Sequence, residues 1–226
     1  MHLNMFDQFK CPEVFFIPTL IPTMMMIILL FRNTAVLMGG RTSTLLSWIT
    51  KQITKNLMSQ LSPMGQKWTN LLMALLMFIL LSNLMGLLPY TFFTTSQLSM
   101  NMAMALPLWL GTVVLGFFSK PNSATAHFLP EGSPAPLSPM LILIETVSLL
   151  IRPVALGVRL TANITAGHLL IHMVSHTTME LLDTKTILPC MTVTLLLALT
   201  FLEIAVACIQ AYVFTLLLSL YLEENT

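Results

Sequence analysis

The sequence has few charged residues, and this scarcity excludes a soluble domain. Asp, Glu, Lys and Arg make up 8% of its 226 residues, and hydrophobic residues make up 56%. In soluble globular domains about a quarter of the residues are charged. Residues 68–119 are 52 consecutive positions without any of the four charged types, enough for two membrane helices of about 20 residues each. The composition therefore predicts an integral membrane protein.

Several motifs are also missing. The three cysteines are widely spaced and form no CxxC pair, which argues against a disulfide framework or a zinc site, so we interpret them as packing residues. There is no GxxxxGK[ST] phosphate loop and no basic cluster of the kind that nucleic acids require. The N-terminus lacks the basic start and cleavage site of a secretory signal. We therefore expect no cofactor, no bound nucleotide and no nucleic-acid partner. The cysteines are Cys11, Cys190 and Cys208.

The placement of the basic residues predicts the membrane topology. The first apolar run, residues 14–31, is long enough to span a bilayer. Residues 32–67 contain five basic residues and no acidic residue, so the positive-inside rule places them on the cytoplasmic or matrix side and the N-terminus on the other side. Within them, apolar residues recur at helical spacing opposite Lys51 and Lys55, which predicts an amphipathic surface helix over residues 43–62. The apolar positions are Leu46, Ile49, Ile53, Leu57 and Leu61.

Four further membrane helices are predicted. Residues 69–88 and 98–118 form a hairpin, and a Pro-, Ser- and Gly-rich loop then returns to the basic side near Lys120. Residues 137–174 and 187–222 are longer than a hydrocarbon core of about 30 Å requires, so we expect both to be broken or strongly tilted. The predicted fold is an all-α integral membrane protein with five membrane helices plus one amphipathic surface helix, the last two membrane helices being long and tilted.

The two long segments each carry a polar stripe. On the penultimate segment, Glu145, Arg152, Arg159 and Asn163 follow one another at intervals of seven, seven and four residues, which places them on one face of a helix, with Ser148 on the same side. An arginine near the bilayer centre costs from roughly 3 to more than roughly 10 kcal/mol, so it is read as functional. The stripe on the last segment comprises Thr192, Glu203, Gln210 and Tyr221.

The combination of residue types points to proton movement. Carboxylates at membrane depth take up and release protons, whereas Arg159 stays protonated. A row of titratable groups interrupted by one permanent cation indicates two proton half-paths separated by an electrostatic gate. The structural alternative, a bundle held together by Glu–Arg pairs, stays open at this point.

Three histidines follow on the same helix. His168, His172 and His176 are spaced at i, i+4 and i+8, and we predict a proton-relay role for His168 because imidazole titrates near neutral pH. His168 lies nine residues after Arg159, nominally on the opposite face, so a bend at Gly167 or the approach of the last helix must bring it to a shared path. Binding of a metal ion by His168 and His172 is the weaker alternative, and we assign no metal site.

The residues RLTANITAGHLL, preceded by ETVSLLIRPVALGV and followed by FLEIAVACIQAYVF, resemble subunit a of the F-type ATP synthase, the mitochondrial form in particular. The resemblance covers essentially the whole chain. It implies a non-catalytic stator subunit that lies beside a ring of c subunits, each with one essential carboxylate. It further implies lipids, peripheral-stalk subunits and other membrane-sector subunits as partners. The implied location is the mitochondrial inner membrane, with several spans, the N-terminus in the intermembrane space and the C-terminus in the matrix.

The resemblance also implies roles for individual residues. Arg159 corresponds to the family's essential arginine, the gate between two offset half-channels. Glu145, with Ser148 one turn away, lines the outlet toward the matrix. His168, Glu203 and Asn163 line the inlet from the intermembrane space. Gln210 faces the ring near Arg159, and Tyr221 lies further along the same stripe.

Two other classes of membrane protein are considered. A proton-conducting or quinone-linked subunit of a respiratory complex would need histidines on two helices to bind haem, but apart from His2 and His127 the histidines all fall between residues 168 and 176. A secondary transporter often shows inverted repeats, and no internal repeat is visible.

Overall fold

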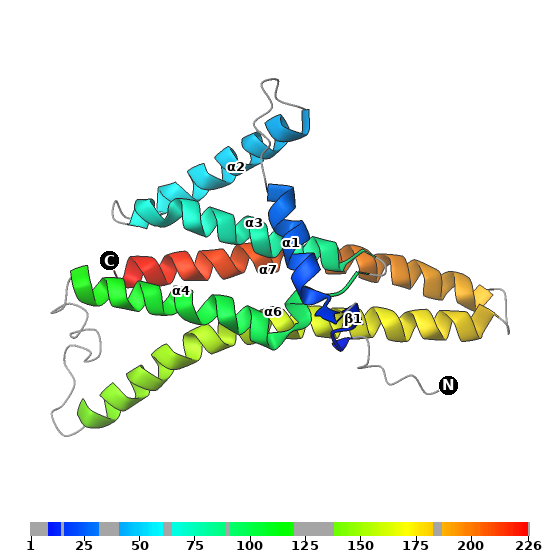
Figure 1. Ribbon diagram of the computed structural model, residues 1–226. Coiled ribbons are helices and arrows are strands. Elements are labelled where there is room, and N and C mark those ends of the chain that lie inside the picture. The colour runs from blue at the N-terminus through cyan, green and yellow to red at the C-terminus, as the bar shows by residue number, and fades with distance from the viewer. Residues whose placement is uncertain are drawn as a thin grey trace.

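The computed structural model describes residues 9–14, 16–31, 41–60, 65–88, 91–119, 138–182 and 187–225. These parts of the chain are helical, apart from one short hairpin of two strands (Figure 1). In chain order the elements are β1 (Glu13–Val14), β2 (Ile17–Pro18), α1 (Leu20–Phe31), α2 (Arg41–Gln60), the 3₁₀ turn η2 (Gly65–Trp68), α3 (Thr69–Gly86), the 3₁₀ turn η3 (Thr94–Ser96), α4 (Leu98–Ser119), α6 (Ser138–Leu182) and α7 (Ile187–Asn225).

Within the described parts of the chain, four helices are long and apolar enough to cross a membrane. They cover Gly65–Gly86, Leu98–Ser119, Ser138–Leu182 and Leu188–Glu224. This result confirms the all-helical membrane class. The division into five spans and one surface helix stays a prediction, because neither α1 nor α2 is among the four. The loop that carries Lys120 lies outside the described residues.

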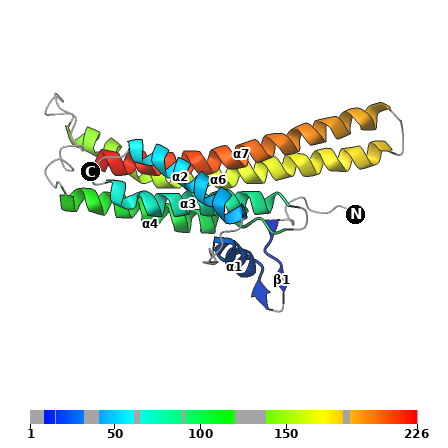
Figure 2. The ribbon, with the colours of Figure 1, turned by 90° about the horizontal axis from the view of Figure 1, so that it is seen from above.

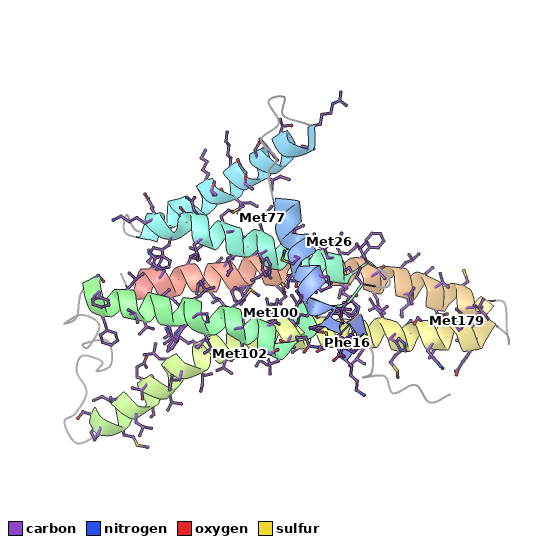
Figure 3. The ribbon with its side chains drawn as sticks, in the orientation of Figure 1. Phe16, Met26, Met77, Met100, Met102 and Met179 are labelled. Atoms are coloured by element: carbon purple, nitrogen blue, oxygen red, sulfur yellow. The ribbon has the colours of Figure 1, made fainter. Side chains whose placement is uncertain are left out.

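The N-terminal segment differs from the predicted helix over residues 14–31. Glu13–Val14 and Ile17–Pro18 pair as the strands β1 and β2 instead, and α1 has only 12 residues, roughly 18 Å in length. Proline explains the difference: Pro18 has no N–H to donate and forces Ile17, the residue before it, into extended backbone. Phe16, at the turn, has φ 64 and is 97% exposed (Figure 3).

The four long helices form two layers. α6 and α7 run antiparallel side by side, α3 and α4 lie against them, and α7 contacts α3, α4 and α6 (Figures 1 and 2). α2 packs against α3, where Ile53 contacts the buried Met73, Leu76 and Met77. The placement of α2 on a membrane surface stays a prediction. One end of the α6–α7 pair extends beyond the α3–α4 hairpin (Figure 1).

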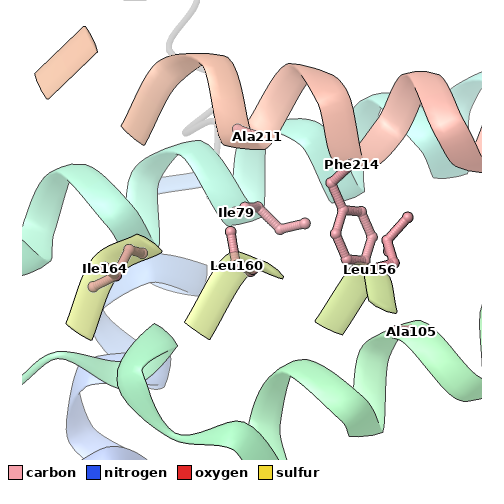
Figure 4. Packing of buried hydrophobic residues seen from close by; sticks show 7 residues of the cluster. All are labelled: Ile79, Ala105, Leu156, Leu160, Ile164, Ala211 and Phe214. Carbon is pink, nitrogen blue, oxygen red and sulfur yellow. The ribbon is translucent and has the colours of Figure 1, made fainter. Parts of the chain in front are cut away.

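The core lies where all four helices meet. It is built from alanine, leucine and isoleucine side chains and one phenylalanine, and their close packing excludes lipid from the middle of the bundle. Figure 4 shows the cluster, in which α6 supplies three of the seven residues. Its members are Ile79, Ala105, Leu156, Leu160, Ile164, Ala211 and Phe214.

α4 crosses α6 at a glycine. A Cβ at Gly157 would lie 2.7 Å from Sδ of Met102 on α4, so no larger residue fits without movement (Figure 3). Beside this crossing the fully buried Asn101 donates from Nδ2 to the Thr95 carbonyl at 2.7 Å and to Oγ1 of Thr161 at 2.8 Å. The bond to Thr161 ties α4 to α6, and the bond to Thr95 holds the amide within the α3–α4 hairpin.

The two long helices exceed the thickness of a bilayer. α6 has 45 residues and α7 has 39, which correspond to roughly 67 and 58 Å. α6 changes direction along its length (Figure 1), and it contains Pro153, which cannot donate the backbone hydrogen bond of a regular helix. α6 continues past the predicted end at residue 174 because residues 175–182 contain no proline or glycine. There His176 Nδ1 lies 3.4 Å from Glu180 Oε1.

Candidate functional site

The polar stripes of α6 and α7 meet at the interface between the two helices. Arg159 is exposed on α6 and lines a small crevice together with Gln210 of α7, which is half-buried. The rest of the crevice is apolar, so the guanidinium and the amide are its polar groups. Its other lining residues are Leu156, Leu160, Val213, Phe214 and Leu217.

A larger cavity of about 320 Å³ lies next along the same interface. Its polar lining comes from Asn163, Glu203 and Gln210, and Gln210 therefore borders both spaces. A cavity of this size has room for water, and three polar side chains supply hydrogen-bonding partners for it. The apolar lining residues are Ala166, Gly167, Leu170, Ile171, Leu199, Leu202 and Val206.

Glu203 lines the larger cavity, and His168 lies directly beside Glu203. Nδ1 of His168 is 3.3 Å from Oε1 of Glu203, and their side chains are 12% and 9% exposed. This distance is that of an ion pair, yet Oε1 accepts no hydrogen bond from any described residue. A buried carboxylate oxygen without a hydrogen-bonding partner calls for water or a proton. His168 faces away from Arg159 on α6, and it is α7 that brings a residue of the last helix, Glu203, next to His168.

Phe93 from the α3–α4 connection covers the histidine. The Phe93 and His168 ring centroids are 3.7 Å apart with the planes inclined at 37°. The adjacent η3 turn is buried, including Thr94 and Thr95. The sequence did not point to Phe93, because an aromatic residue in a turn has no periodicity that would connect it with His168, which follows 75 residues later.

Two buried amides of the hairpin were also missed. Asn83 donates from Nδ2 to the Ala207 carbonyl of α7 at 3.3 Å. The Oδ1 atoms of Asn83 and Asn101 are buried and have no hydrogen-bond partner among the described residues. The signal was present in the sequence, since each asparagine interrupts an otherwise apolar helix, where polar side chains mark helix contacts or pathways.

The other predicted site residues lie elsewhere along the stripe. Glu145 and Ser148 are half-buried near the start of α6 and border neither space, and the Ser148 hydroxyl donates to the Glu145 backbone carbonyl at 2.8 Å. Tyr221 packs against the core cluster near the end of α7. His172 is exposed. Among the described residues there is no group of three or more His, Cys, Asp or Glu side chains placed to hold a metal ion.

Gly167 determines how closely α7 approaches. A Cβ at this position would lie 2.9 Å from Oε1 of Glu203 and 3.4 Å from its Cδ. The obstructed atoms belong to the end of a flexible side chain, so a methyl group would displace the carboxylate and leave the backbone in place. The glycine therefore reserves the space that the carboxyl group occupies.

We expect Gly167→Ala to lower proton conduction along this interface by about 10-fold while the protein still folds, because displacement of a reacting group by about 1 Å has effects of this order or larger. Conduction is measured with a pH-sensitive dye in membrane vesicles, and folding on native gels. Gly111→Ala on α4 is the matched control, since no atom lies within 4 Å of a Cβ there. Equal proton conduction by both variants would show that Gly167 does not position the carboxyl group of Glu203.

Fold and site together define a class: a multi-pass helical membrane protein that carries a buried acid, a histidine and an arginine along one helix interface, the arginine having no partner among the described residues. Comparison with known proteins identifies the family. The family model described as ATP synthase A chain matches residues 14–223. The chain belongs to this family, and ATP synthesis and proton transport follow from that membership.

Individual relatives match over their whole length. Proteins named ATP synthase F(0) complex subunit a are 57% identical in Lycodon semicarinatus, 54% in Struthio camelus and 50% in Bos taurus, each over 226 residues and 100% of both chains. The sequence-based resemblance to subunit a is thereby confirmed. Family membership also argues against the respiratory-complex and secondary-transporter interpretations.

Proposed function

We propose that this chain is the proton-translocating stator subunit of the ATP synthase membrane sector and forms two offset half-channels against a ring of c subunits. One observation carries the proposal: the unpaired Arg159 and the buried His168–Glu203 pair lie along the same α6–α7 interface, with Asn163 and Gln210 between them. A fixed cation and a proton-exchanging pair separated along one seam are what a gated path requires.

The inlet is built around Glu203. Water in the adjacent cavity brings protons to the carboxylate, and His168, at 3.3 Å, accepts or returns one without leaving its place. Asn163 and Gln210 order that water by hydrogen bonding and carry no charge that would compete for the proton. A proton then passes from Glu203 to an ionised carboxylate of the ring.

The gate is the Arg159 guanidinium. It attracts a ring carboxylate in its ionised form and does not release a proton itself, so protons do not cross directly from one half-channel to the other. A carboxylate that has passed the gate gives its proton to the outlet, where Glu145 and Ser148 lie. Each ring carboxylate is neutral in lipid because a bare charge there is too costly.

The energy comes from the membrane potential. One elementary charge that crosses 100 mV releases roughly 2.3 kcal/mol, and the gate converts this release into rotation in one direction. ATP chemistry belongs to partner subunits, so this chain is not an enzyme alone. Its proposed location is the mitochondrial inner membrane, with the N-terminus in the intermembrane space, the C-terminus in the matrix and α6 and α7 strongly tilted against the ring.

Thiol labelling from each side of the membrane tests the two half-channels. Ser148→Cys and Asn163→Cys are introduced separately into a chain whose three native cysteines are replaced by serine, and the assembled complex is labelled in sealed vesicles of either orientation with a membrane-impermeant reagent. We expect residue 148 to react from the matrix side and residue 163 from the opposite side. Reaction of both positions from the same side contradicts the offset arrangement, and the cysteine-free complex gives the background.

A further inference from the structure

A second arginine lies on the same face of α6 as the gate. Arg152 precedes Arg159 by seven residues, which is about two helical turns and roughly 10 Å along the axis. Its surroundings are different. Nη1 of Arg152 lies 2.6 Å from Oε2 of Glu224 at the end of α7, and its Cζ lies 5.3 Å from the centroid of the Tyr221 ring.

Arg159 has no such partner. Among the residues that the structure describes, none forms a hydrogen bond or an ion pair with its guanidinium, and Arg159 is exposed beside Gln210. Of the two arginines on this face, one is therefore neutralised within the chain and the other is left available to an outside anion. The sequence places Glu224 72 residues after Arg152, so only the return of α7 brings the two together.

We propose that Glu224 is a positioning residue for proton translocation: it neutralises Arg152, with Tyr221 beneath the guanidinium, so that Arg159 alone attracts the ring carboxylate. This inference rests on the proposed function. Without Glu224, a second fixed cation stands about two turns from the gate, and charges that far apart, roughly one Debye length, are only partly screened from each other. A carboxylate then has two places to stop, and its release toward the outlet slows.

The contacts fit a neutralising role better than a mechanical one. The side chains of Arg152 and Glu224 are 27% and 45% exposed, and ion pairs as exposed as this contribute little to stability. α6 and α7 are already held together by the core cluster, which includes Leu160 and Phe214. Tyr221 packs against that cluster, so its ring gives the guanidinium a fixed platform.

Single and double variants separate the two roles. Glu224→Gln and Arg152→Gln both break the ion pair, but only the first leaves an unpaired cation. In the assembled complex we expect Glu224→Gln to lower ATP-driven proton pumping by about 5-fold. Arg152→Gln and the double variant are expected to stay within about 2-fold of wild type. Glu223→Gln, which removes a neighbouring exposed acid, is the matched control and is expected to behave as wild type.

Two results overturn the inference: equal loss in Glu224→Gln, Arg152→Gln and the double variant, which makes the pair a mechanical clamp, or no loss in Glu224→Gln. If Glu224→Gln fails to assemble, Arg152→Gln distinguishes the two roles, because a mechanical clamp predicts the same failure of assembly and charge neutralisation predicts normal assembly and pumping.

Arg159→Ala in the same preparation separates the test of this inference from the test of the proposed function. If Arg159→Ala still pumps protons with coupling to ATP, the proposed function is refuted. If Arg159→Ala loses coupled pumping but Glu224→Gln pumps as wild type, only this inference is refuted.

Discussion

Replacing Arg159 with alanine is expected to lower ATP synthesis by at least about 100-fold while the membrane sector still conducts protons. The exposed guanidinium has no partner among the described residues, so we expect its removal to leave the fold intact. In the proposed mechanism it also removes the cation that attracts the ring carboxylate, so that protons would pass between the half-channels without turning the ring. The measurement compares ATP synthesis, ATP-driven pumping and passive proton flux in vesicles that carry the assembled complex.

Two further variants define what Arg159 does. Arg159→Lys is expected to lose coupled synthesis as well, because lysine lacks the planar delocalised fork and can deprotonate where it is desolvated. Arg41→Ala, at the exposed start of α2, removes one arginine far from the α6–α7 seam in sequence and is expected to be neutral. If Arg159→Ala retains unchanged coupled pumping, the charge of Arg159 has a structural role and the gate hypothesis is wrong.

Glu203→Gln is expected to slow proton uptake by about 100-fold or more, because one positioned proton-transfer group typically contributes about 10²- to 10⁴-fold. Glutamine has the same size and hydrogen-bonding reach but cannot take up a proton, so the packing beside Gly167 and His168 is kept. Uptake is followed as passive proton flux driven by an imposed potential, and the amount of assembled complex is measured on native gels.

The control for Glu203→Gln is Glu180→Gln. Glu180 is exposed near the end of α6 and lies 3.4 Å from His176, so it offers a second carboxylate–imidazole pair outside the cavity. This variant is expected to conduct as wild type. Loss of the assembled complex in Glu203→Gln, with normal assembly in Glu180→Gln, would assign Glu203 to structure and not to conduction.

The sequence was most informative where a residue type is costly. Long runs without charge predicted the membrane class and the long apolar helices. The rarity of charge also revealed two polar stripes, one with Arg159 on the penultimate helix and one with Glu203 and Gln210 on the last helix. The predicted relation between His168 and the stripe was incomplete, because the helical spacing places His168 opposite Arg159. The structure resolves it through α7, whose Glu203 reaches His168 from the other side.

Features that depend on tertiary contact could not be predicted. Phe93 stacks on His168, and Glu224 pairs with Arg152, through approaches that no local period encodes. The predicted N-terminal helix is too long because its apolar composition does not reveal that Pro18 restricts the backbone of the preceding residue to an extended conformation. The roles of the individual stripe residues stay predictions for the labelling and flux experiments.

The buried amide between α4 and α6 has a mechanical consequence. In the proposed function the chain is a stator that must resist torque, and the turning ring would apply its force along the surface of α6. Van der Waals packing holds helices together in lipid but has no fixed direction, whereas an interhelical hydrogen bond has one and contributes about 0.6 kcal/mol on average. Asn101, held at once by Thr95 and Thr161, thus gives α6 a shear-resistant anchor to the hairpin behind it.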